Sequence, residues 1–205
     1  MLRLWSGSMK STPDGFPKTV TLGQSAVTLR EMRSSDEKAV LAFAQSLPPH
    51  DLLFISRDIS NPKVVSAWVE AIRLGTIWTL LALDGDRILG TAALTRDRLS
   101  WSPHVGELRV VVAPDARAQG LGRTLVQECV RKALQLNVKK LIANMTADQK
   151  GAMAIFEEFG FHREALLKDH VIDRDGKFYD LAVLSDGSGQ AKARLSDVES
   201  AGQGR

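Results

Sequence analysis

A strand, a short loop and a long helix follow one another between residues 105 and 136, and this unit limits the fold more than any other segment. The apolar run Val105–Ala113 predicts a buried strand, which Pro114 ends. The helix from about Gly120 to Leu136 repeats apolar residues every four positions, so it has one apolar face. The chain therefore contains a strand and a one-sided helix that must pack together, with glycines at the helix start.

The rest of the chain alternates strands and helices. Ser34 and Glu37 form a capping-box pattern at the start of the first helix, and Pro48-Pro49 ends it. The other predicted helices are 61–75, 120–136 and 150–159, and the predicted strands are Thr19–Leu22, Ala26–Arg30, Ile77–Leu83, Arg87–Thr95, Val105–Ala113, Lys140–Met145, 161–171 and 178–184. This order predicts an α/β chain with a mixed sheet and helices on both faces.

Length and composition are those of one ordinary globular domain. The chain has 205 residues, 44% of them hydrophobic and 25% charged, which is enough apolar material for a core. We assign the domain to residues 18–186, because 1–17 and 187–205 are polar segments that predict disordered tails. The single cysteine, Cys129, excludes an internal disulfide and favours a reducing compartment, so we expect a cytoplasmic protein.

Charge and hydropathy exclude several kinds of partner. Residues 1–18 carry a net charge of +2 and residues 187–205 a net charge of +1, which together account for the whole +3. The body between them is therefore neutral and offers no basic face for nucleic acid. No apolar run approaches the roughly 20 residues of a membrane span. His50, His162 and His170 are too widely spaced to suggest a metal site, and we expect none.

The glycines at the start of the third helix predict an anion site. The first amides of a helix lack intrahelical acceptors, and the helix dipole adds about half a positive charge there. Gly120 and Gly122 have no Cβ atoms, so a phosphate can approach the backbone. Arg117 and Arg123 add charged donors. Taken alone, the glycines are also explained by a tight loop that binds nothing.

Two common nucleotide loops do not fit. A Walker loop needs Gly-Lys-Ser/Thr, whereas Gly122 is followed by Arg123 and Thr124. A Rossmann fingerprint needs a third glycine, and Leu125 stands in that place.

Two sequence blocks resemble the GNAT superfamily of acyl-CoA-dependent N-acyltransferases. The first is Val-x-x-Pro-x-x-Arg-x-x-Gly-x-Gly over residues 111–122, preceded by Glu107 on the strand. The second, Gln149–Phe161, is similar to the family segment Asn-x-x-Ala-x-x-Leu-Tyr-Glu-Lys-x-Gly-Phe. The blocks stand in the family's order, and the resemblance spans roughly residues 26–184.

The resemblance implies a GNAT-like fold and a site for acetyl-CoA. It implies a central twisted, mostly antiparallel sheet in which the strand 105–113 splays from Lys140–Met145, with the pantetheine arm in the gap and the pyrophosphate on the loop amides. The residues it assigns to this site are Val110, Val111, Val112, Arg117, Ala118, Gln119, Gly120, Leu121, Gly122, Arg123, Gln149 and Phe156.

Catalysis requires a base, because a lysine-type amine has a pKa near 10.4 and must lose a proton before it attacks a thioester. Glu107 is the leading candidate; the alternative is that it only pairs with Arg109, two residues away on the same strand face. His104 is the reserve candidate. The family's thiolate acid is a tyrosine, and Phe156 occupies that position here. Cys129 lies on the apolar helix stripe and is assigned to the core.

The acceptor is less constrained. The resemblance implies that it is bound by Ser34–Gly75 and Leu166–Tyr179, where charged residues suit either a cationic amine or a solvated hairpin tip. Residues 46–54 weakly resemble protein-lysine acetyltransferases, so a protein lysine or a small amine is expected. Trp101 either lines this site or packs within its loop.

Two functions of other classes stay open. These are a non-catalytic CoA-binding regulatory module and a plain interaction domain that keeps the fold. The oligomeric state also stays open, with a homodimer as the commonest assembly.

Overall fold

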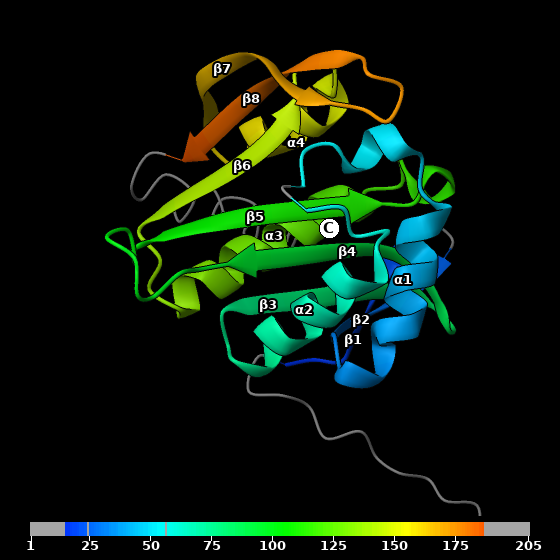
Figure 1. Cartoon of the computed structure of the whole chain (residues 1–205). Coiled ribbons are helices and arrows are strands. Elements are labelled where there is room, and N and C mark those ends of the chain that lie inside the picture. Colours follow the sequence, from blue (N-terminus) through cyan, green and yellow to red (C-terminus); the bar gives the residue numbers. More distant parts are fainter. Residues whose placement is uncertain (1–14, 24, 56, 187–205) are drawn as a thin grey trace, which may run out of the picture.

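The computed structural model describes residues 15–23, 25–55 and 57–186, and it forms one open sheet (Figure 1). Its eight strands lie in the order β1-β2-β3-β4-β5-β6-β8-β7. All neighbouring pairs are antiparallel except β5 and β6, which run parallel. The strands are β1 (Lys18–Leu22), β2 (Ser25–Glu31), β3 (Ile77–Asp84), β4 (Arg87–Thr95), β5 (Val105–Val112), β6 (Lys140–Thr146), β7 (Phe161–Ile172) and β8 (Phe178–Asp186). The predicted α/β class with a mixed, mostly antiparallel sheet is confirmed.

Helices cover both faces of this sheet (Figure 1). On one face, α1 (Glu37–Ser46) and α2 (Pro62–Arg73) pack against each other and against β4 and β3. On the other face, α3 (Leu121–Gln135) packs on β4 and β5, and α4 (Lys150–Glu158) packs on α3 and β7. None of the helices in the described part of the chain is both long and apolar enough to cross a bilayer.

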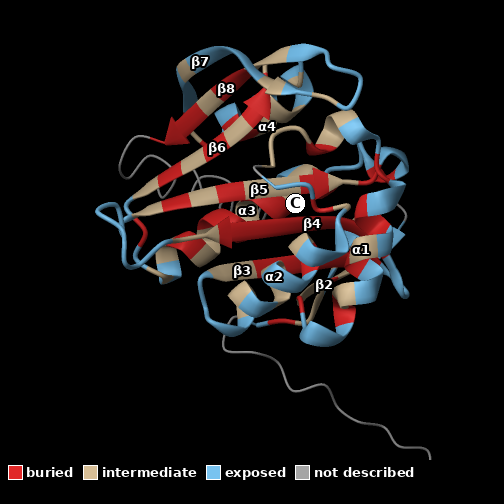
Figure 2. Ribbon diagram, viewed as in Figure 1, coloured by how far each residue is buried: buried red, intermediate tan, exposed pale blue. Residues whose placement is uncertain are grey.

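The middle of the sheet is buried because helices cover it on both sides. Figure 2 shows β4 buried over almost its whole length, from Ile88 to Leu94. Leu80, Leu81 and Ala82 of β3 are fully buried as well. The edge strand β7 is mostly exposed. The core therefore lies under α1, α2 and α3, around the central strands.

Two predicted boundaries differ from the structure. Phe16 is buried and packs its ring 6.2 Å from that of Trp78, so the ordered chain extends into the predicted tail. The first helix does not begin with a box of Ser34 and Glu37. Instead, Asp36 accepts a hydrogen bond from the Arg33 amide at 2.7 Å within a 3₁₀ turn. The rest of both predicted tails, 1–14 and 187–205, lies outside the described residues.

Gly90 in β4 is required by close packing between β4, β5 and α3. A Cβ atom at this position would stand 2.8 Å from the carbonyl oxygen of Val111 and 3.1 Å from Cδ1 of Leu125. We therefore expect Gly90→Ala to lower the free energy of unfolding by about 1–3 kcal/mol in urea titrations. Gly151→Ala is the control, since its Cβ would meet nothing within 4 Å. Equal stability of the two variants would contradict the packing argument.

Candidate active site

The site begins where the only parallel strand pair in the sheet separates. The ladder between β5 and β6 runs from the pair Val105–Lys140 to the pair Leu108–Ala143 and ends there. Beyond it β5 continues to Val112 and β6 to Thr146, and the two ribbons diverge (Figure 1). The predicted splayed pair is therefore present in the fold.

The register of β4 and β5 shows which backbone groups face this gap. The Ala113 amide donates to the Leu89 carbonyl at 2.8 Å, so Ala113 belongs to a hydrogen-bonded antiparallel pair. Such pairs alternate with non-bonded pairs, and Val112 and Val110 fall on the alternate positions. Their amides and carbonyls consequently point away from β4, towards the gap.

A groove of about 560 Å³ occupies the same place. It is lined by the end of β5, the start of α3, the start of α4 and the connection between α1 and α2. Its lining residues are Asp51, Phe54, Val110, Val111, Val112, Arg117, Ala118, Gly122, Val126, Asp148, Gln149, Lys150, Gly151, Ala152, Ile155 and Phe156. A Cβ at Gly122 would stand 3.3 Å from Cδ1 of Ile155, so a side chain there would narrow the groove.

The start of α3 presents backbone donors at one end of this groove. Gly120, the residue before the helix, has φ of +88°, a conformation that glycine adopts without strain. The helix that follows has 15 residues, so its dipole is fully developed at this end. The shape and the donors fit an elongated ligand that carries phosphate at this end and an amide-containing chain along β5.

The predicted site residues divide into two groups. Eight of the twelve CoA positions line the groove: Val110, Val111, Val112, Arg117, Ala118, Gly122, Gln149 and Phe156. The other four positions do not line the groove. The Leu121 side chain is buried in the core, and the Gln119 side chain donates to the Asp115 carbonyl. Gly120 has no side chain, and its place at the helix start still suits an amide donor.

Arg123 does not contribute the charge that the sequence suggested. Its Nε donates to Glu158 Oε2 at 2.8 Å, and its guanidinium lies 5.9 Å from the Phe159 ring centroid. The charge is therefore used between α3 and α4. Arg117 is the arginine that lines the groove.

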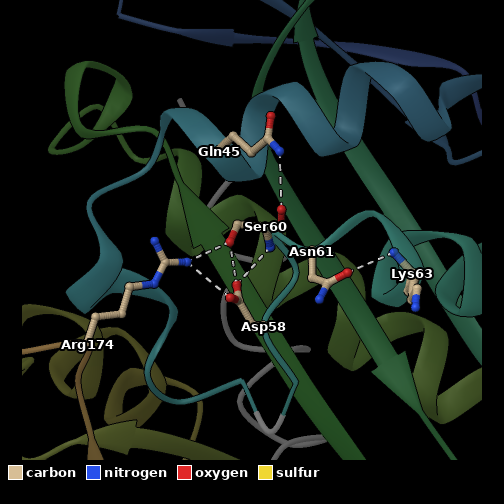
Figure 3. Close-up of polar contacts among 6 residues, drawn as sticks. All are labelled: Gln45, Asp58, Ser60, Asn61, Lys63 and Arg174. Carbon is tan, nitrogen blue, oxygen red and sulfur yellow. Dashed lines mark hydrogen bonds and ion pairs between the residues drawn. The ribbon is translucent and has the colours of Figure 1, made fainter. Parts of the chain in front are cut away.

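The residues that connect α1 and α2, described over 47–55 and 57–61, are called the strap below. The strap crosses the groove and is bound at three places. His50 Nε2 lies 3.0 Å from Asp148 Oδ2, Asp51 pairs with Arg117, and Asp58 pairs with Arg174 of the β7–β8 turn. Figure 3 shows the last contact, in which Arg174 reaches both Asp58 and Ser60.

A second cavity of about 370 Å³ lies on the α2 side of the sheet, and Val111 lines both spaces. Its walls come from the strap, α2 and strands β3 to β5. They comprise Ile55, Arg57, Ile59, Val64, Ala67, Trp68, Ala71, Ile77, Thr91, Ala93, Thr95, Arg109 and Val111. These described walls hold two arginines and no acidic residue. Below, this space is called the α2 pocket.

Glu107 lies on the same strand face as Arg109 and Val111. Its Oε2 accepts a hydrogen bond from Arg109 at 2.7 Å, and its Oε1 lies 3.3 Å from Asn144 Nδ2 on β6. Glu107 also lines an open depression that includes Arg109, beside the α2 pocket. The pairing with Arg109, one of the two sequence-level alternatives, is therefore present. His104 is exposed, and its carbonyl accepts the amides of Lys139 and Lys140.

The acids of the β7–β8 turn stabilise the turn itself. Asp173 Oδ1 accepts the amides of Asp175 and Lys177, and its Oδ2 accepts the Tyr179 hydroxyl. The bond from the Lys177 amide contributes most to lowering the pKa of Asp173, and the bond to Asp173 raises the pKa of Tyr179. These side chains are engaged locally, which favours the solvated hairpin tip over a binding site for a cationic amine.

Trp101 fits neither of its two predicted roles. Its side chain is fully exposed, as is that of Leu99 in the same loop. The aromatic residue that lines the α2 pocket is Trp68, whose Nε1 donates to Thr79 Oγ1 at 2.9 Å. The helical spacing of Trp68 is that of an ordinary core residue. Only the three-dimensional arrangement identifies it as a residue that lines the pocket.

Comparison with known proteins agrees with this geometry. The Acetyltransferase (GNAT) family model matches residues 48–161, more than half of the chain. The chain therefore belongs to the GNAT family of acetyltransferases, and these comparisons support an acyltransferase.

The individual relatives have low sequence identity to this chain. The chain is 28% identical to phosphinothricin N-acetyltransferase of Alcaligenes faecalis over 80% of its own length and 84% of the relative's. A segment covering 38% of the chain is 32% identical to the phosphinothricin acetyltransferase homologue YwnH of Bacillus subtilis. This segment spans 47% of that relative, about half of its length. A solved phosphinothricin acetyltransferase of Sinorhizobium meliloti, in complex with AcCoA, has the same fold. Its TM-score is 0.66 at 20% identity, over 82% of this chain and 91% of that one.

Cys129 is predicted to be inert. It belongs to α3, its side chain is buried in the core, and burial strongly raises the pKa of its thiol. We expect an aromatic disulfide reagent at neutral pH to release less than about a tenth of an equivalent of chromophore from the folded protein. One full equivalent should appear in denaturant, since the chain has a single cysteine. Fast labelling of the folded protein would contradict the assignment of Cys129 to the core.

Proposed function

We propose that this protein transfers an acetyl group from acetyl-CoA to the primary amine of a small acceptor that carries an anionic group. The observation that carries this proposal is the meeting of two spaces at Val111. The groove between the splayed strands has the features of a CoA site, and Val111 lines both this groove and the α2 pocket. A thioester in the first space and an amine in the second would be adjacent, so direct attack needs no covalent enzyme intermediate.

The donor half of the proposal rests on the groove. The outward amides of Val110 and Val112 and the outward carbonyl of Val110 are suited to pair with the amides of a pantetheine arm, whereas the Val112 carbonyl already accepts hydrogen bonds from Arg117. The amides that begin α3, together with Arg117, are suited to a pyrophosphate. The solved relative from Sinorhizobium meliloti, which was crystallised with AcCoA, agrees with this assignment.

Glu107 is proposed as the residue that accepts the proton of the attacking amine. It shares a strand face with Val111, at which the two spaces meet, and it borders the α2 pocket through Arg109. Arg109 and Asn144 hold the carboxylate in place from both sides. Because Glu107 lines the depression next to the pocket, the proton can pass either directly or through one water molecule.

The departing thiolate needs another source of a proton. Phe156 lines the groove where the family's tyrosine stands, and its ring packs edge-on against Phe161 at 5.1 Å. The only tyrosine of the chain, Tyr179, is bound to Asp173 in the hairpin turn. We infer that solvent protonates the thiolate.

The acceptor half rests on the charge of the α2 pocket. Among the described lining residues the charged ones are Arg57 and Arg109, and Arg109 is already paired with Glu107. A polyamine or a lysine side chain would meet positive charge there, whereas a carboxylate or phosphinate would be stabilised. The Alcaligenes relative is named for an acceptor other than a protein, phosphinothricin. This argument favours a small amine over a protein lysine.

Loss of the Glu107 carboxylate should separate chemistry from cofactor binding. We expect Glu107→Gln to lower kcat by about 10²–10⁴-fold, the usual range for a general base, and to leave the affinity for CoA unchanged. Free thiol released from acetyl-CoA in the presence of an amine panel measures the first quantity, and calorimetry with CoA measures the second.

The same assay decides between the enzyme and a regulatory module. The pairing of Glu107 with Arg109 and the phenyl ring of Phe156 are the observations that favour a non-catalytic CoA-binding protein. Tight CoA binding without amine-dependent thiol release on a broad panel would support that alternative. Failure of the wild-type protein to bind CoA at all would overturn the whole proposal.

The anionic acceptor can be tested at Arg57. We expect amino acids to be acetylated with a kcat/KM at least about tenfold higher than the matching amines that lack the carboxylate, a difference of ~1.4 kcal/mol. Arg57→Gln should raise KM for the amino acids by about five- to tenfold and leave the simple amines unaffected. Lys63→Gln removes an exposed positive charge outside the pocket and is the matched control. An equal loss for both substrate types would refute the role of Arg57.

A further inference from the structure

Most of the hydrogen-bonding capacity of Arg117 is already used within the protein. Its Nε and Nη2 both donate to the Val112 carbonyl at 3.1 Å, and its Nη2 also donates to Asp51 Oδ2 at 2.5 Å. An arginine has five N–H donors, so these bonds leave only the two on Nη1. The residue expected to bind phosphate is therefore held by a carboxylate of the same chain.

Asp51 stands in the groove beside Arg117. It lines the same space, and its side chain is only 18% exposed, whereas that of Arg117 is 46% exposed. A phosphate drawn to Arg117 would consequently meet the negative charge of Asp51 at short range. Like charges this close disfavour binding, and the partial burial of Asp51 limits screening by solvent.

The strap holds Asp51 in this position through contacts that do not involve Arg117. On one side, the neighbouring His50 contacts Asp148, and its ring lies 4.9 Å from that of Tyr179. On the other side, Arg174 donates to Asp58 and Ser60 at 3.0 and 2.8 Å (Figure 3). The carboxylate is thus kept near Arg117 by the fold as well as by its own ion pair.

We propose that Asp51 competes with the pyrophosphate of the cofactor for Arg117, and so weakens cofactor binding. The proposal rests on the function proposed above, because it takes the groove to be the CoA site. When phosphate binds, Arg117 exchanges the Asp51 carboxylate for a phosphate oxygen and keeps its bond to the Val112 carbonyl. Asp51 then determines how tightly the cofactor is held without contacting it favourably.

Calorimetric titration of the full chain with CoA at fixed ionic strength tests this proposal. Asp51→Asn keeps the size of the side chain and removes the charge, so we expect the Kd for CoA to fall by about three- to tenfold, as for the loss of a partly exposed competing ion pair. In an Arg117→Gln background the same substitution should change the Kd by less than about twofold, since the group for which Asp51 competes is gone.

Asp58→Asn is the matched control, because it breaks a strap contact at Arg174 without altering charge in the groove. We expect it to leave the Kd unchanged. An unchanged or higher Kd in Asp51→Asn would overturn the proposal and make Asp51 a residue that orients Arg117. An equal fall of the Kd in Asp58→Asn would overturn the proposal too, because a loosened strap, and not the charge of Asp51, would then explain the tighter binding of CoA. Absence of CoA binding by the wild-type protein is a different failure, that of the proposed function.

Discussion

The end of the β5–β6 ladder at Leu108 and Ala143 is the feature on which the rest of the site depends. A parallel pair that continued to Val112 would satisfy the outward backbone groups of β5 and close the groove. Because the strands separate, β6 does not pair with those groups, and the Val112 carbonyl can accept the Arg117 side chain instead. The opening also brings the groove next to the α2 pocket at Val111.

Features encoded in contiguous residues could be predicted from the sequence. Gly120 and Gly122 follow a strand that ends before Pro114, and this short segment is sufficient to locate the strand, loop and helix start that border the groove. The α/β class follows from the alternating pattern of strands and helices. The assignment of Cys129 to the core also needed only the spacing of its own helix, and its complete burial agrees.

Features that depend on long-range contacts could not be predicted. Arg174 and Asp58 are separated by 116 residues, and Arg117 and Asp51 by 66. No local pattern relates such partners. The resemblance places the strap within the acceptor region Ser34–Gly75, but its ion pairs with Arg117 and Arg174 appear only in the structure. Trp101 is a second example. Its place before β5 predicts either a site residue or packing within the loop, yet the loop carries its side chain into solvent.

The strap is a partition shared by the groove and the α2 pocket. Asp51 and Phe54 face the groove, whereas Ile55, Arg57 and Ile59 face the α2 pocket. Under the proposed function, a lineage that altered its acceptor by mutating the strap would therefore disturb its donor affinity at the same time. Val64, Ala67 and Ala71 of α2 line the α2 pocket and do not line the groove. Evolution of new acceptor preferences, in nature or by laboratory selection, should thus accumulate changes on α2 and preserve the strap.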